Sequence, residues 1–291
     1  MSAPGPATRL RARLASGKMI RSVGIHDAFS ALLLEQAGLE MAFLGGFAAS
    51  ASLLGLPDLN FLNQSEMATA VARITARLHT PLVADGDTGH GDLPQVTRTV
   101  ELFEAAGAAG ILLEDQVLPK RCGHFPDKRV IPAAEMVLKL RAARLARRDP
   151  DFVLIARTDC RASEGIDAAI DRANRYGDEG ADVVFVEAPE TVPELEAMAA
   201  RVRYPQLVNL VTGGKTPLLD LPALEALGFE IAVYAVDTLL VCGAVLRRLF
   251  AQVRDGERVA MAPGEMLSFD ELKQILGLPR WLALRETLER D

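Results

Sequence analysis

Two aspartates stand two positions apart in the segment DGDTGHG, residues 85–91. Asp85 and Asp87 follow an apolar run, so both carboxylates can point into one space at the end of a strand while the neighbouring glycines let the backbone bend. With Glu114, which ends another apolar run, they form an all-oxygen ligand set that suits Mg²⁺ or Mn²⁺ better than Zn²⁺. The plain alternative is a capped strand end, and His90 is interpreted as a loop residue.

An arginine ends a third apolar run, VLIAR. The planar guanidinium of Arg157 can bind a carboxylate through two parallel hydrogen bonds. An arginine here can also be a structural partner of Glu187, and the sequence leaves both roles open. A metal ion beside an arginine suits a substrate with a carboxylate next to an oxygen, such as a 2-oxo acid or its enolate.

A polar loop with the sequence EDQVLPKRCGHFPDKR, residues 114–129, contains the catalytic candidates Lys120, Cys122 and His124. The cations beside Cys122 and a nearby metal ion would favour its thiolate, so this residue is a candidate proton donor or acceptor. A long polar loop bounded by prolines is also a candidate lid. A single cysteine is more often a packing residue, and the other two cysteines, which lack such neighbours, are interpreted that way.

Eight short apolar runs alternate with longer segments of helical period, which predicts an α/β protein with a (β/α)8 barrel over a single domain, residues 1–291. A doubly wound sheet is the alternative, but no G-x-G-x-x-G motif follows the first run. We expect an N-terminal helix within 1–20 and a helical extension at 262–291. The runs are SVGIHD, MAFLGG, TPLVADGD, GILLED, DFVLIARTD, DVVFVE, QLVNLV and EIAVYAV.

A formal net charge of −7 argues against binding to nucleic acid or anionic lipid, and no apolar run is long enough to span a bilayer. Three widely spaced cysteines fit a reducing compartment, so the predicted location is the cytoplasm. The first 18 residues are basic and lack acidic residues, which is also typical of an organellar transit peptide. The helical spacing of TRLRARL favours an ordinary helix.

The motifs taken together resemble the isocitrate lyase and phosphoenolpyruvate mutase superfamily, in particular its small-lyase branch of 2-methylisocitrate and 2,3-dimethylmalate lyases. The resemblance runs from Ser22 to Leu284. It implies a (β/α)8 barrel whose eighth helix is exchanged between subunits, usually in tetramers, and Mg²⁺ that holds an enolate-type intermediate. The motifs that carry it are GLPD, DGDTGHG, EDQ..PKRCGH, ARTD, FVEAP and GGKTP, in this order.

The resemblance also implies roles for individual residues. Asp85 and Asp87 would hold the metal, largely through water, with Asp58 and Glu114 supporting its shell. Cys122 would be the acid or base on a flexible loop, and the K-[KR]-C-G-H pattern there is typical of carbon–carbon cleavage. Residues binding the 2-oxo acid half would be Gly45, Gly46 and Arg157, and those lining the pocket would be Gly123, Glu187 and Asn209.

The chain departs from the methylisocitrate lyase pattern at positions that would contact substrate. Phe43 and Gly45 replace a tyrosine and a serine, and arginines expected near Leu240 and Phe269 are missing. Because a desolvated carboxylate without a partner costs several kcal/mol, a tricarboxylate substrate is disfavoured. The sequence gives no account of Asp237, which stands in an altered YPL motif, or of the replacement of a family glutamate by Thr212.

These observations predict a Mg²⁺-dependent lyase that cleaves a malate-type 2-hydroxy acid, alkylated or not, by retro-aldol chemistry to a 2-oxo acid and a carboxylate. The general base is left open between a metal-linked water and a carboxylate, because Phe43 cannot serve. Two alternatives remain: a phosphonomutase or oxaloacetate-type decarboxylase of the same superfamily, and a non-catalytic barrel that binds a 2-oxo acid. The expected assembly is a homotetramer, a dimer of dimers.

Overall fold

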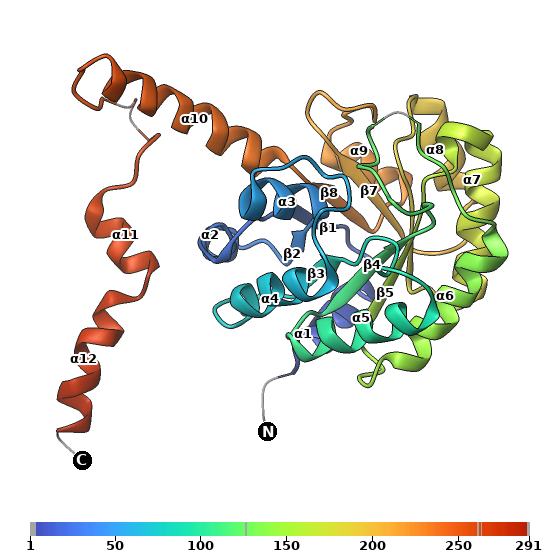
Figure 1. Ribbon diagram of the computed structural model, residues 1–291, viewed down its shortest axis with the longest axis horizontal. Helices are drawn as coiled ribbons and strands as arrows, with labels where there is room; N and C mark the ends of the chain where they lie inside the picture. Colours follow the sequence, from blue (N-terminus) through green and yellow to red (C-terminus); the bar gives the residue numbers. More distant parts are fainter. Residues whose placement is uncertain (1–3, 126, 261, 263, 290–291) are drawn as a thin grey trace. The chain divides into compact units, whose positions relative to one another are not determined.

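The computed structural model describes residues 4–125, 127–260, 262 and 264–289. Within these residues, eight parallel strands close into a barrel in chain order, which confirms the predicted fold (Figure 1). The strands are β1 (Ile20–Gly24), β2 (Met41–Leu44), β3 (Leu82–Asp85), β4 (Gly110–Glu114), β5 (Val153–Thr158), β6 (Val183–Val186), β7 (Gln206–Leu210) and β8 (Ile231–Tyr234). Seven of them lie within the predicted apolar runs, whereas β1 begins at Ile20, two residues before its run.

Helices follow the strands and surround the barrel (Figure 1). The helix α3 was not predicted, and α1 is shorter than the predicted range 1–20, of which residues 1–3 lie outside the described part. The helices of the barrel part are α1 (Pro6–Leu14), α2 (Ala28–Gln36), α3 (Gly46–Leu54), α4 (Gln64–Thr75), α5 (Leu93–Ala105), α6 (Ala133–Ala146), α7 (Arg161–Asp178), α8 (Val192–Arg201) and α9 (Leu221–Leu227).

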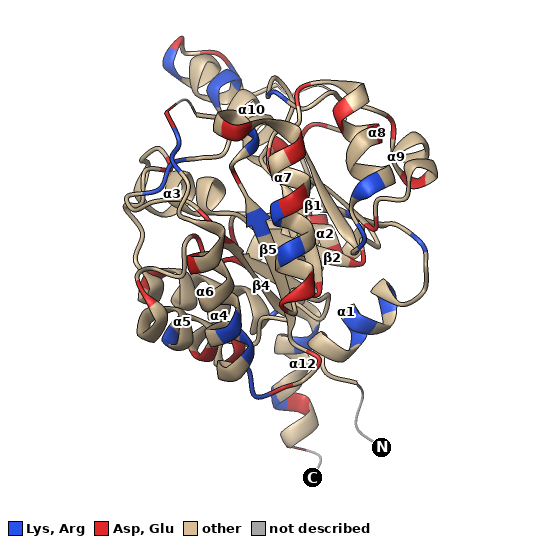
Figure 2. Ribbon diagram, turned by 90° about the vertical axis from the view of Figure 1, so that its right-hand side faces the viewer, with Lys and Arg blue, Asp and Glu red and all other residues tan. Residues whose placement is uncertain are grey.

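Local sequence signals set where these helices begin and how they face the barrel. Asn63 begins α4: its side chain accepts from the backbone N–H of Glu66, whose side chain accepts from the backbone N–H of Asn63. Along α7, Ala169, Ile170 and Ala173 are buried, and Figure 2 shows several positions of the same helix coloured as charged residues. The helices therefore pack one apolar side on the barrel.

The core has two layers because successive residues of a strand point to opposite faces. On β2, Met41 and Phe43 belong to the apolar cluster inside the barrel, while Ala42 and Leu44 belong to the cluster between barrel and helices. Leu10 of α1 is fully buried and joins the inner cluster. The amino-terminal helix thus closes one end of the barrel, which leaves the carboxyl ends of the strands for the site.

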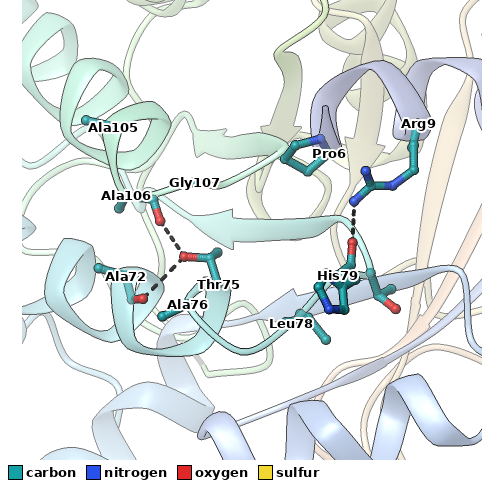
Figure 3. A pocket seen from close by; sticks show the side chains of 11 residues that line it. Pro6, Arg9, Ala72, Thr75, Ala76, Leu78, His79, Ala105, Ala106 and Gly107 are labelled. Atoms are coloured by element: carbon teal, nitrogen blue, oxygen red, sulfur yellow. Dashed lines mark hydrogen bonds between the residues drawn. The ribbon is translucent and has the colours of Figure 1, made fainter. Parts of the chain in front are cut away.

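At the closed end, a cleft of about 530 Å³ lies between α1, α4 and the turn after α5 (Figure 3). The guanidinium of Arg9 donates to the backbone carbonyls of His79 and Pro4, and the hydroxyl of Thr75 donates to the carbonyl of Ala106 at 2.5 Å. These polar groups of the cleft donate hydrogen bonds to the protein backbone, so they stabilise the fold.

The chain divides after Thr238 into the barrel and a second unit that begins at Leu239. The second unit holds most of α10 (Asp237–Arg254), together with α11 (Phe269–Ile275) and α12 (Leu278–Leu288), both inside the predicted range 262–291, of which 263, 290 and 291 are not described. These three helices lie within the described part of the chain, and none of their residues is buried. The single-domain assignment and the helix exchange stay predictions. None of the described helices combines the length and apolar character needed to cross a membrane.

Candidate active site

The aspartates of DGDTGHG lie at the carboxyl end of β3, against the start of α3. Asp85 Oδ2 accepts from the backbone N–H of Gly46 at 3.0 Å, and Asp85 Oδ1 accepts from that of Asp87 at 2.9 Å. A Cβ atom on Gly46 would stand 3.0 Å from Lys120 Nζ, 3.1 Å from Asp87 Oδ1 and 3.3 Å from Asp85 Oδ2. Glycine at this position lets the helix start approach the carboxylates closely.

A buried lysine from the loop after β4 enters this group of carboxylates. Lys120 Nζ lies 2.6 Å from Asp58 Oδ1 and 2.5 Å from Asp87 Oδ1, and the lysine side chain is 2% exposed. Burial alone would lower the pKa of Lys120, but Asp87, Asp58 and Asp85 raise it well above its usual range. Burial raises the pKa of Asp87 to about 7, and the negative charges of Asp85 and Asp58 add to the rise. Lys120 counteracts these effects only in part.

Arg157, at the end of β5, is bound to three carboxylates. Its guanidinium donates to both oxygens of Asp159 at 2.9 Å and lies 3.1 Å from Glu187 Oε2 and 3.2 Å from Glu114 Oε2. The predicted structural role beside Glu187 is therefore present, and a grip on substrate stays a prediction. Burial would raise the pKa of Asp159, but Arg157 and Lys128 lower it to about 2, so this carboxylate is charged.

The loop that carries Cys122 and Gly123, described over residues 115–125 and 127–131, contacts the residues at the carboxyl ends of the strands. The backbone N–H of Cys122 donates to the Asp58 carbonyl at 3.2 Å. Gly123 packs so closely that a Cβ there would lie 2.4 Å from both the Arg157 guanidinium and the Glu187 carboxylate. The catalytic candidate Cys122 is thus brought to the predicted carboxylates and arginine.

Burial raises the pKa of the Cys122 thiol to about 11; Asp58 and Glu187 add to the rise, and a backbone hydrogen bond at His124 opposes it. The side chains alone therefore do not favour a thiolate as expected, and the effect of a metal ion stays a prediction. Burial is the largest cause, and the ammonium group of Lys120 contacts Asp58 and Asp87. A protonated thiol is suited to giving a proton rather than to taking one.

His124 and Asn209 differ in how the structure connects them to the loop. His124 Nδ1 accepts from the backbone N–H of Lys215 at 3.2 Å, and Nε2 lies 3.5 Å from Glu187 Oε1. Burial lowers the pKa of His124, so its ring is neutral near pH 7. Asn209 lies on β7 with its buried Oδ1 unpartnered, and no described contact joins it to Cys122.

Gly45 precedes α3 and packs against Phe43, where a Cβ would lie 3.0 Å from the ring.

The predicted metal ligands form an incomplete set as the side chains stand. Among the described residues, no three His, Cys, Asp or Glu side chains form a ready group of ligands, because Lys120 Nζ lies between Asp58 and Asp87. The donors are all hard oxygens, Glu114 Oε1 is buried without a partner, and burial raises the pKa of Glu114 well above its ordinary value. Burial makes ionisation of these oxygens costly, and a divalent cation that keeps much of its water would compensate that cost.

Three residues that sequence reasoning did not include as site residues hold the loop and its neighbours. Lys128 is buried and donates to Asp159 Oδ1 at 2.7 Å. Asp115 accepts from the backbone N–H of Asp159 at 2.9 Å. Asp115 and Asp159 directly follow strand-end residues, which is a usable signal, whereas Lys128 stands among other charged loop residues. Asp237 Oδ1 accepts from the hydroxyl of Thr212, which joins the segments after β7 and β8.

Comparison with known proteins decides the family. The family model described as phosphoenolpyruvate phosphomutase matches residues 10–254. The chain belongs to the phosphoenolpyruvate phosphomutase family. This membership confirms the resemblance predicted from the motifs. One relative, the 2,3-dimethylmalate lyase of Eubacterium barkeri, is 37% identical to this chain over 274 residues. The match covers 94% of this chain and 95% of the relative.

Other proteins that are similar to this chain have related names. The 2-methylisocitrate lyase of Shewanella oneidensis is 38% identical and covers 86% of each chain. The structure of oxaloacetate acetylhydrolase with the inhibitor 3,3-difluorooxalacetate superposes with a TM-score of 0.92 at 33% identity, covering 98% of this chain and 97% of that one. Phosphonopyruvate hydrolase with oxalate and Mg²⁺ gives a TM-score of 0.87 at 30% identity, with 97% and 99% covered. The named lyases agree with the predicted enzyme class.

Proposed function

We propose that this enzyme is a metal-dependent carbon–carbon lyase that cleaves a malate-type 2-hydroxy acid, alkylated or not, to a 2-oxo acid and a carboxylate. One observation carries the proposal: the loop that carries Cys122 packs through Gly123 against Arg157 and Glu187, where burial raises the pKa of the thiol. Relatives named 2,3-dimethylmalate lyase and 2-methylisocitrate lyase support it.

The site's own residues account for the proton movements. A base takes the proton of the substrate hydroxyl, the C2–C3 bond breaks, and C2 with its oxygen becomes the carbonyl of the 2-oxo acid. The electron pair of that bond passes to the departing fragment, an aci-carboxylate, whose carbon takes the proton of the Cys122 thiol. Before the next turnover, the base releases its proton to solvent and the thiolate of Cys122 takes one up. The base is a carboxylate of the site or a water molecule.

The carboxylates at the ends of β3 and β4 would hold Mg²⁺, or alternatively Mn²⁺. Asp85 and Asp87 would hold it with Asp58 and Glu114 in support, and when bound it would stabilise negative charge on the oxygens of the 2-oxo acid. A neighbour of known structure was solved with oxalate and Mg²⁺. The backbone at Gly45 and Gly46 and the guanidinium of Arg157 would bind the 2-oxo acid half, with Gly123, Glu187 and Asn209 lining the pocket.

A second candidate function is hydrolysis or decarboxylation of oxaloacetate. It is favoured by the TM-score of 0.92 to oxaloacetate acetylhydrolase. Both candidates share the proposed metal and a substrate with a carboxylate beside an oxygen, so product analysis separates them.

The three free cysteines fit the reducing cytoplasm as location, and the apolar surface of α10 to α12 fits a homotetramer.

The test is a substrate panel of malate, alkylmalates, oxaloacetate and phosphonopyruvate, assayed with Mg²⁺ and after chelation. We expect a 2-oxo acid and a carboxylate from one of the malates, and loss of turnover on chelation that Mg²⁺ restores. Cys122→Ser should lower turnover by about 100-fold or more, because serine is a far weaker acid and proton transfer contributes about 10²- to 10⁴-fold. Near-normal turnover of this variant would contradict the acid role, and phosphorus rearrangement detected by ³¹P NMR would indicate a mutase.

A further inference from the structure

Two buried lysines, one on each side of Cys122, connect the loop of residues 115–131 to the barrel. Lys120 reaches Asp58 and Asp87, which belong to the proposed metal cluster. Lys128 reaches Asp159, which directly follows β5 and lies outside that cluster. The first contact belongs to the chemistry already described, whereas the second has no part in it.

The ammonium group of Lys128 makes two contacts that join the loop to the barrel. Its Nζ donates to the backbone carbonyl of Gly123 and, at 2.7 Å, to Asp159 Oδ1. The side chain of Lys128 is 2% exposed and that of Asp159 is 0% exposed. A lysine seldom lies so deep without an ionic partner, so the pair fixes the place of this side chain.

The position of Gly123 determines how the loop fits the site. Its Cα lies so close to Arg157 and Glu187 that a Cβ would stand 2.4 Å from either side chain. A hydrogen bond to the carbonyl of Gly123 therefore fixes the backbone next to the thiol of Cys122. A misplacement of the thiol by about 1 Å would be enough to slow proton transfer by about 100-fold.

The contact of Lys128 can be removed without leaving a buried charge alone. Asp159 would keep both hydrogen bonds from Arg157, at 2.9 Å each. Its backbone N–H would still donate to Asp115 at 2.9 Å. Loss of the lysine charge is therefore expected to loosen the loop and to leave the end of β5 in place.

We propose that Lys128 is a positioning residue that fastens the Cys122 loop over the barrel mouth through the Gly123 carbonyl and Asp159, independently of any metal ion. Its consequence for turnover rests on the lyase function proposed above. Its consequence for the loop does not, because the contacts are made within the chain.

The experiment compares Lys128→Met with the wild-type enzyme by amide hydrogen exchange and by steady-state kinetics. We expect amides of the peptide covering 116–125 to exchange about tenfold faster or more, with Mg²⁺ and after chelation alike, because the closed loop is less favoured. We expect kcat to fall about 10- to 100-fold with a smaller change in KM, because the thiol is misplaced while the substrate contacts remain.

Lys139→Met is the matched control, because Lys139 is also buried and donates to a backbone carbonyl, that of Thr88, at 2.7 Å. It should leave exchange over 116–125 unchanged. If Lys128→Met does not fold, Lys128→Gln keeps a polar group and is measured instead. Loop exchange within twofold of wild type, or faster exchange only after chelation, would overturn the proposal. If no substrate is turned over, the lyase function fails while the exchange result still decides the role of Lys128.

Discussion

Cys122 is a half-buried residue whose thiol is kept neutral by its surroundings. Burial raises its pKa from 9.0 to about 11, with Asp58 and Glu187 adding to the rise. Because the folded chain favours the neutral thiol, ionisation of Cys122 works against the closed loop as pH rises from about 9 toward 11. At neutral pH the group is a proton donor, as the proposed cleavage requires.

This protonation predicts slow alkylation. At pH 7 to 8, Cys122 of the native enzyme should react with iodoacetamide about 100-fold more slowly than in the urea-unfolded chain, because thiolate is the reacting form and the pKa difference lowers its fraction by that factor. Peptide mass spectrometry after timed quenching measures both rates. Equal rates would show that the loop is open in solution or that the thiol ionises easily.

The sequence predicted the aspartates and the loop cysteine because each stands at a strand end or among residues of unusual chemistry. It did not predict where the side chains turn. Lys120 and Lys128 are both loop lysines in the sequence, and only the fold shows that Asp58 and Asp159 receive them. Contacts between residues far apart in the chain leave no local signal, which is why the lysine pairs and the protonation of Cys122 were missed.

At the scale of elements, the strands were predictable because parallel strands buried on both faces are continuous apolar runs. The helix α3 was missed because Gly45 precedes it, Gly46 begins it and it contains two serines, all of which are typical of loops. Its formation is explained by the site, since the backbone N–H of Gly46 donates to Asp85 at 3.0 Å. The helix start thus lies where a carboxylate accepts its free N–H.

A buried carboxylate joins β4, β5 and α7. Asp115 is 0% exposed and accepts from the hydroxyls of Thr158 and Tyr176 at 2.7 Å and from Arg172 at 3.1 Å. Burial and the charge of Asp159 raise the pKa of Asp115, and the hydrogen bonds from the Asp159 backbone, Thr158 and Tyr176 counteract the rise. Because the partners come from β5 and α7 while Asp115 follows β4, the network fixes the direction in which the Cys122 loop leaves β4.

Tyr176→Phe should therefore lower the free energy of unfolding by about 1 to 3 kcal/mol, because it removes a hydrogen bond to a buried charge. Urea unfolding measures the change. The matched control is Tyr204→Phe, because the hydroxyl of Tyr204 donates to Asp178 at the surface at 2.5 Å. This variant should change the free energy of unfolding by about 0.5 kcal/mol or less. Equal effects of the two variants would show that the Asp115 network adds no stability beyond a surface contact.

At the scale of the whole molecule, the barrel and the carboxyl-terminal helices differ in how they bury apolar residues. Within the described barrel, apolar side chains fill an inner and an outer cluster. In α10 to α12, large side chains are exposed instead, among them Phe250 at 62%, Phe269 at 75% and Trp281 at 52%. The sequence predicted helices there from their period, but a single chain cannot show what covers them.

Such surface predicts association, because monomeric proteins rarely expose apolar patches of this extent. By the predicted helix exchange, a second copy covers these helices, giving a dimer and then a tetramer. Truncation before Ala262, or Phe269→Asp in the full chain, should lower the assembled fraction at micromolar concentration and reduce turnover. Native mass spectrometry and activity on the same samples measure both. The control is Leu145→Asp, a residue of α6 that is 85% exposed on the barrel, which should leave assembly unchanged. A stable, fully active monomer of the unaltered chain would contradict the prediction, because the exposed helices would then need no partner.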